Sequence, residues 1–123
     1  MALIAWRAPQ LSSDSELAIQ NYRDAVVELV AGTGRAVALL DVARRADPLF
    51  ALAHVDHAIL AGLAADTPVG ATTTRGERQH IETVRLWQRG DPQRARDLRR
   101  EHLLEFAGDL VVVVLPLLLE RNV

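Results

Sequence analysis

Ten consecutive residues near the C-terminus, LVVVVLPLLL at 110–119, consist of nine apolar residues and one proline. A run of valines favours a strand, because β-branched side chains pack well on a pleated surface. The other segments of the chain show helical periodicity, however, and a lone strand without a partner is not stable. We therefore expect a helix here, kinked or broken at Pro116, with a strand as the alternative.

The composition points to a helical core built from small aliphatic side chains. Half of the 123 residues are apolar, but only five are aromatic, which favours close-packed helices over sheets. The absence of cysteine excludes disulfides and thiolate metal ligands. The net charge of −2 gives no reason to expect nucleic acid as a partner, and no cofactor is expected.

The sequence shows no evident membrane-spanning segment or signal peptide. No apolar run approaches the ~20 residues that a membrane-spanning helix needs. The first eleven residues lack the basic start of a signal peptide. We therefore expect a cytoplasmic protein without a membrane span.

Apolar side chains recur at helical spacing in five segments before the apolar tail. We expect these helices over residues 13–31, 34–46, 48–65, 75–89 and 92–107, followed by a sixth over the tail. Ser13 and Glu16 have the spacing of a capping box at the first helix. The expected fold is all-α, with about six helices in antiparallel hairpins. Residues 1–11 form an irregular arm that Trp6 and Leu11 could anchor to a single helical domain, residues 12–123.

The segment RGERQHIETVRLWQRGDPQRARDLRREHLLEFAGDLVVV, residues 75–113, combines a Glu-Arg-x-His helix with a Trp-x-x-Gly-Asp turn. The pattern continues with a small residue in the next helix and a leucine-rich end of that helix. An Asp-Leu pair then starts the following segment. Over residues 34–114 the chain resembles the tetratricopeptide-repeat protein 38 family. The positions that carry the resemblance are Glu77, Arg78, His80, Trp87, Gly90, Asp91, Ala95, Leu103, Asp109 and Leu110.

The resemblance implies a helical-repeat fold, which is commonly used to bind partners. The family has no well-established reaction, so the resemblance implies no catalytic residue. This chain departs from the family pattern in two ways. Gly108 stands where a proline is expected, and only one helix follows it, whereas members of the family continue through several more repeats.

Four histidines and two charged residues could meet between the third, fourth and fifth helices. Imidazole and carboxylate groups suit zinc or iron. A di-iron bundle needs two Glu-x-x-His motifs, however, and the chain has one, Glu77-x-x-His80. We expect structural polar groups, with Glu77 or His80 hydrogen-bonded to the third or fifth helix. An enzyme, metal site or small-molecule site is the alternative, and it would use His54, His57, Glu77, Arg78, His80 and His102.

The apolar tail predicts self-association. A helix that is apolar all round must be buried, and little chain follows this one to cover it. Left exposed, it would form a patch larger than the few hundred Å² usual on soluble monomers. We therefore expect a non-enzymatic interaction or assembly module, a homodimer or a partner-binding protein. The expected interface residues are Leu110, Val113, Val114, Leu117 and Leu118.

Overall fold

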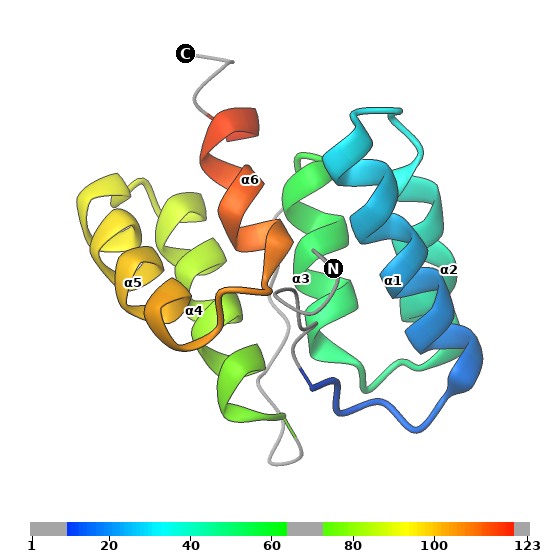
Figure 1. Ribbon diagram of the computed structural model, residues 1–123. Coiled ribbons are helices and arrows are strands. Elements are labelled where there is room, and N and C mark those ends of the chain that lie inside the picture. The colour runs from blue at the N-terminus through cyan, green and yellow to red at the C-terminus, as the bar shows by residue number, and fades with distance from the viewer. Residues whose placement is uncertain (1–9, 64–72, 120–123) are drawn as a thin grey trace, which may run out of the picture.

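The computed structural model describes residues 10–63 and 73–119, and within these ranges it contains six helices and no strand (Figure 1). The all-α prediction is confirmed, and the valine run is helical. The helices are α1 (Glu16–Ala31), α2 (Ala36–Ala46), α3 (Ala51–Leu60), α4 (Arg75–Gln88), α5 (Pro92–Glu105) and α6 (Leu110–Leu119).

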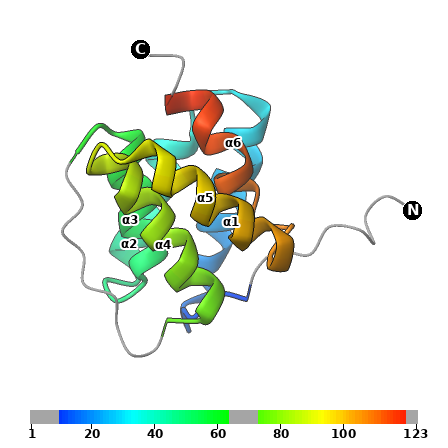
Figure 2. The same ribbon diagram turned by 90° about the vertical axis from the view of Figure 1, so that its left-hand side faces the viewer.

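Two helical hairpins lie on either side of α3. Helices α1 and α2 pack as one hairpin and α4 and α5 as the other, while α3 contacts α2 and α4 (Figures 1 and 2). Helix α6 lies between the hairpins and contacts α1, α4 and α5. In an open repeat stack each unit would contact only its sequence neighbours. Here α6 closes the arrangement by returning to α1.

Local capping explains where most helices begin and end. Gly32 ends α1 with a φ of 72°, a left-handed conformation that glycine adopts without steric cost. The predicted capping box at Ser13 is wrong, because Ser15 is the N-cap and its side chain accepts from the Ala18 amide. A complete capping box occurs instead at α4, between Thr74 and Glu77.

Helix α3 starts three residues later than Pro48, where we expected it. The Asp47 side chain accepts a hydrogen bond from the Leu49 amide at 3.0 Å, and the Asp47 carbonyl accepts one from the Phe50 amide at 3.0 Å. These bonds hold residues 47–50 in a turn that precedes the helix. The helix ends at Leu60, and the predicted extension to residue 65 runs into residues 64–72, which lie outside the described part.

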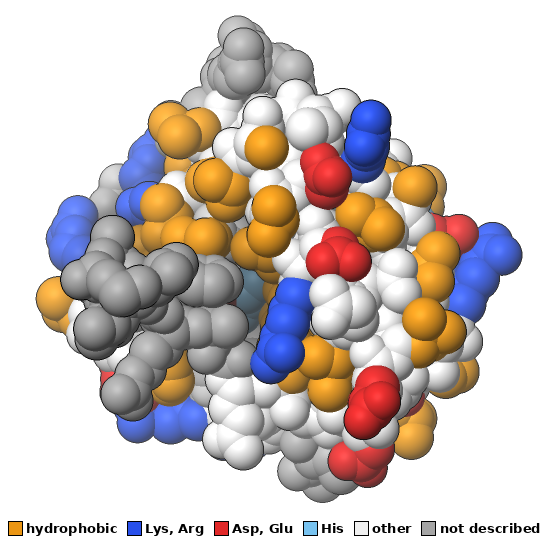
Figure 3. Space-filling model, turned by 45° about the vertical axis from the view of Figure 1, so that its right-hand side comes forward, with side chains coloured by type: hydrophobic (Ala, Val, Ile, Leu, Met, Phe, Trp, Pro, Cys, Tyr) orange, Lys and Arg blue, Asp and Glu red, His pale blue; other side chains and the backbone are white. Residues whose placement is uncertain are grey.

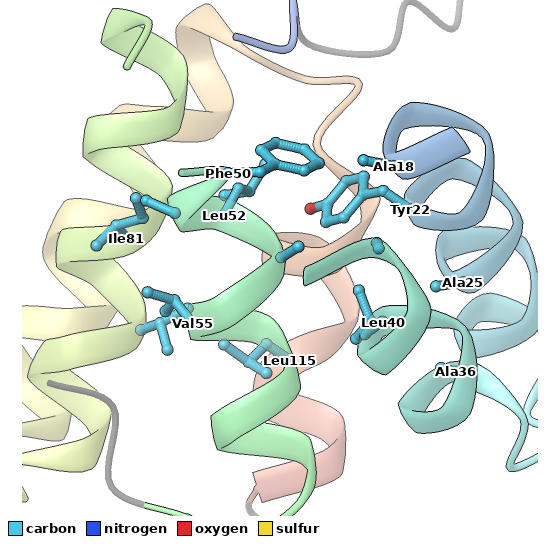
Figure 4. Close-up of a cluster of buried hydrophobic side chains, with 14 residues drawn as sticks. Ala18, Tyr22, Ala25, Ala36, Leu40, Phe50, Leu52, Val55, Ile81 and Leu115 are labelled. Atoms are coloured by element: carbon cyan, nitrogen blue, oxygen red, sulfur yellow. The ribbon is translucent and has the colours of Figure 1, made fainter. Parts of the chain in front are cut away.

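The hydrophobic core fills the space between α1, α2, α3, α4 and α6 (Figure 4). Alanines on α1 and α2 bring these two helices close together, and the larger side chains come mainly from the centre of the molecule. The Tyr22 and Phe50 rings pack with their centroids 5.3 Å apart. The largest fully buried apolar side chains are Phe50, Leu52, Val55, Ile81, Val84, Val112 and Leu115.

The sequence suggested that α6 is apolar on every side and left uncovered. In the structure, one side of α6 is covered. Its inner face, Val111, Val112 and Leu115, is buried within the protein's own fold. The predicted interface residues lie on the rest of the surface of α6. Leu117 is 65% exposed, and the others are partly buried: Leu110, Val113, Val114 and Leu118.

The predicted N-terminal arm is described only at its end. Leu11 has no regular secondary structure and packs against the core, as we expected of an anchor. Trp6, the other expected anchor, lies outside the described residues. Within residues 10–63 and 73–119, no helix combines the length and apolar character needed to span a membrane.

Candidate functional site

A buried histidine lies between two carboxylates at the centre of the molecule. His80 Nε2 is 2.5 Å from Asp56 Oδ1, and His80 Nδ1 is 2.7 Å from Asp109 Oδ2. All three side chains are almost completely buried. An ionised carboxylate can only accept hydrogen bonds, so both ring nitrogens of His80 donate. The pair of contacts therefore fits an imidazolium held between two anions.

The network extends to both hairpins. The Tyr22 hydroxyl donates to Asp56 Oδ2 at 2.7 Å, which ties α1 to α3. His102 Nε2 donates to Asp109 Oδ2 at 2.7 Å, and its Nδ1 lies 2.9 Å from the side-chain amide of Gln79. Within the described residues, the network thus joins five helices: α1, α3, α4, α5 and the start of α6.

The charges of the network shift the pKa values of its members. Burial by itself would lower the pKa of His80, but Asp109 and Asp56 outweigh it and raise this pKa well above its ordinary value. Burial would raise the pKa of Asp109, but His80 and His102 hold it well below its ordinary range. Burial, followed by the charge of Asp56, raises the pKa of Tyr22. The network therefore favours a charged His80, a charged Asp109 and a neutral Tyr22.

Two polar side chains, Asp109 and Arg99, make hydrogen bonds to the backbone of α6. Asp109 precedes the helix, and its Oδ1 accepts from the Val112 amide at 3.4 Å, so a negative charge lies at the positive end of the helix. Arg99 of α5 donates to the carbonyls of Val112 and Val113 at 2.9 and 3.0 Å. Pro116 has no amide hydrogen, so the Val112 carbonyl lacks its intrahelical donor. Arg99 supplies the missing donor.

Glu77 is buried but does not belong to the network of His80. Its Oε1 accepts from the Thr74 amide at 2.8 Å. Its Oε2 accepts from the amide and hydroxyl of Ser12, at 3.2 and 3.1 Å. Glu77 therefore fixes the chain before α1 against the start of α4. Arg78 is exposed and donates to the Thr73 carbonyl at 2.8 Å.

The remaining histidines make local contacts near α2 and α3. His54 Nε2 lies 2.9 Å from the Pro48 carbonyl oxygen. His57 Nε2 lies 3.8 Å from Asp41 Oδ1, and burial together with Arg44 lowers its pKa. The structure thus brings only His80 and His102, of the six predicted residues, into one network. Across residues 10–63 and 73–119, no group of three or more histidines and carboxylates is arranged to hold a metal ion.

Sequence reasoning assigned no functional role to Tyr22, Asp56, Gln79 or Asp109. Asp56 carried the clearest signal, because it is the one carboxylate in a helix whose only other polar residues are His54 and His57, and it must be paired when buried. Asp109 directly precedes an all-apolar helix, which is a signal for a cap. The contribution of Tyr22 depends on tertiary packing, which its position in a helical stripe does not reveal.

An apolar groove lies next to this network, between α1 and the start of α6. Its volume is about 340 Å³, and its aliphatic lining includes Leu11, Val27 and Leu110. Tyr22 and Asp109 also line it, so the groove reaches two members of the network. On this side of the molecule, Figure 3 shows hydrophobic side chains gathered around a hollow.

Comparison of the chain with protein-family models, with curated proteins and with solved structures found no match.

Proposed function

We propose that the protein is a non-enzymatic helical interaction module that self-associates through the outer face of α6. The observation that carries this proposal is the division of α6 into two apolar faces. One face is used by the core, whereas Leu117 on the other is 65% exposed. An apolar side chain gains about 1.5–3 kcal/mol on full burial, which favours association. The other residues of this outer face are Leu110, Val113, Val114 and Leu118.

The polar contacts of α6 support this role. Asp109 fixes the first turn of the helix through His80 and His102, and Arg99 fixes the carbonyls of Val112 and Val113. A surface held in one conformation before binding loses less entropy when it binds. In the proposed dimer, the same face of each copy would meet around a twofold axis, the commonest symmetry of small oligomers.

The family resemblance of residues 34–114 and the two helical hairpins support a tetratricopeptide-like class within this proposal. A cytoplasmic location belongs to the same proposal and is supported by the lack of cysteine. The alternative ligand or metal role has less support. The ring nitrogens of His80 and His102 are already paired with protein groups, so a ligand would have to displace these contacts.

The test is the mass of the protein in solution over a concentration series, measured by light scattering. We expect the wild type to form a dimer at micromolar concentrations. Leu117→Arg and Val113→Asp should each abolish the dimer, because an unpaired charge in a dry interface costs several kcal/mol. Leu49→Arg is the matched control, since Leu49 is 84% exposed in the turn before α3.

Circular dichroism should show that the helices persist in all three variants. A wild-type protein that stays monomeric at every concentration would refute the proposal. Loss of the dimer in Leu49→Arg as well would show that α6 is not the specific interface.

A further inference from the structure

We infer that the two copies of the proposed dimer pack their α6 helices antiparallel, so that Leu117 of each copy enters the apolar groove between α1 and α6 of the other. The occupant of the groove is then a second copy of this chain, an assignment that rests on the proposed self-association and adds its orientation. The groove has a volume of about 340 Å³, which lies at the small end of ligand pockets and suits one or a few side chains.

The groove and the outer face of α6 form one continuous surface. Leu110 belongs to both, because it lines the groove and also lies on the outer face of α6. The opposite wall of the groove is the side of α1 that carries Val26 and Val27, and Val27 is 61% exposed. A second copy that covers the outer face of α6 therefore also reaches the groove.

The apolar positions of the outer face are self-complementary in an antiparallel pair. Leu110 and Leu117 are seven residues apart in α6, so they lie on the same side of the helix, about 10.5 Å apart along its axis. Val113 and Val114 lie midway between them. A twofold axis that passes between Val113 and Val114 therefore places Leu117 of each copy beside Leu110 of the other. In a parallel pair, each Leu117 would face its own equivalent, and neither would reach the groove.

The charges at the groove favour the same orientation. Arg23 and Asp24 are the exposed charged residues among those that line it. Asp24 Oδ1 accepts a hydrogen bond from Gln20 Nε2 at 2.9 Å, whereas Arg23 forms no ion pair with another residue of the described ranges. Antiparallel packing brings the C-terminal end of the second copy's α6 to the groove, and this end carries the partial negative charge of the helix dipole. The guanidinium of Arg23 complements that charge.

Single cysteines test the orientation, because the natural chain has none. Leu110→Cys and Leu117→Cys proteins, one of them labelled with nitrogen-15, are mixed under reducing conditions and then oxidised. A disulfide needs two Cα atoms within about 7 Å, and antiparallel packing separates like positions by about 10.5 Å along the helix. Mass spectrometry should therefore show several-fold more of the mixed disulfide than of the two like disulfides together.

Leu104→Cys is the matched control, because Leu104 is 84% exposed on α5, outside the proposed interface. Mixed with Leu117→Cys, it should give only background cross-linking. Predominance of the like disulfides would indicate parallel packing and overturn the inference while leaving the dimer in place. Mixed and like disulfides in the proportions of random pairing would also overturn it. A wild-type protein that is monomeric in light scattering would refute the self-association itself, and the inference with it.

A second measurement covers the case in which the cysteine variants fail to fold. Val27→Asp places a charge in the groove without entering the core, so it should raise the Kd of the dimer at least tenfold in light scattering. Val42→Asp is its control, because Val42 is exposed on α2 and is not among the residues that line the groove, and it should leave the Kd unchanged. A dimer that tolerates both substitutions equally would show that the groove lies outside the interface.

Discussion

The charge on His80 makes the stability of the protein depend on pH. Its ordinary pKa is 6.5, and although burial opposes it, Asp109 and Asp56 raise the folded-state pKa well above that value. Between the two values the folded state holds a proton that the unfolded state has lost, so the free energy of unfolding falls as pH rises. For Asp109 the sign is reversed. Burial is outweighed by His80 and His102, its pKa is lowered from 3.8, and stability falls as pH drops below that value.

We predict that His80→Ala lowers the free energy of unfolding by about 3–5 kcal/mol at pH 5.5, because two buried carboxylates lose their partner. In the wild type this free energy should decline from pH 6.5 to pH 8.5. In His80→Ala the decline should be absent, since the titrating group is gone. Denaturant unfolding at several pH values measures both effects. His54→Ala is the control, and it should keep the wild-type slope. An unchanged slope in His80→Ala would contradict a charged His80.

The sequence predicted part of this network at the level of single residues. The hydrogen bond from His80 to α3, through Asp56, agrees with the expectation of a structural role. Glu77 and Arg78, which we grouped with His80, have other hydrogen-bond partners than His80. Arg78 donates to the nearby Thr73 carbonyl, and Glu77 accepts from Thr74 and from the more distant Ser12. His80 pairs with Asp56 and Asp109, which only the tertiary fold brings near. Sequence spacing describes one helix face and cannot identify its partner.

At the level of elements, α6 tolerates an internal proline because α5 supplies a replacement donor. Pro116 removes the hydrogen bond that the Val112 carbonyl would receive, and Arg99 donates to this carbonyl and to that of Val113. A cation near these carbonyls also compensates their partial negative charge. The short helix α6 thus depends on a side chain that lies 13 residues earlier in the chain.

We predict that Arg99→Met lowers the free energy of unfolding by about 1–3 kcal/mol, because it leaves the Val112 carbonyl without a donor. In a Pro116→Ala background the cost should be smaller, since the alanine introduced there has a backbone amide that can donate to that carbonyl. The two substitutions should therefore show a coupling energy of about 0.5–3 kcal/mol in a double-mutant cycle. Additive effects, measured by denaturant unfolding of all four proteins, would exclude the compensation.

Most helix boundaries could be predicted because the chain marks them locally. Gly32 and Gly90 have positive φ values at the ends of α1 and α4, and Pro92 opens α5. The start of α3 was missed because the Asp47 side chain makes a turn that sequence periodicity does not show. In α6 every residue is apolar, so the sequence could not indicate which face packs inward.

At the scale of the whole molecule, α6 converts a linear series of helices into a closed arrangement. It contacts α1 at one end of the series and α4 and α5 at the other. Leu115 is completely buried on its inner face and belongs to the same core cluster as Ala18 and Tyr22 of α1 and Ile81 of α4. A substitution at Leu115 should therefore destabilise both hairpins.

We predict that Leu115→Ala lowers the free energy of unfolding by about 2–5 kcal/mol, the usual cost of emptying a packed leucine site. Amide hydrogen exchange should accelerate in α1 and α4 together, because both contribute to the core cluster that contains Leu115. Leu104→Ala is the control, since Leu104 is 84% exposed on α5, and it should change stability by no more than about 0.5 kcal/mol. If Leu115→Ala accelerated exchange only in α5 and α6, the helices would behave as an open stack in which each unit depends on its sequence neighbour.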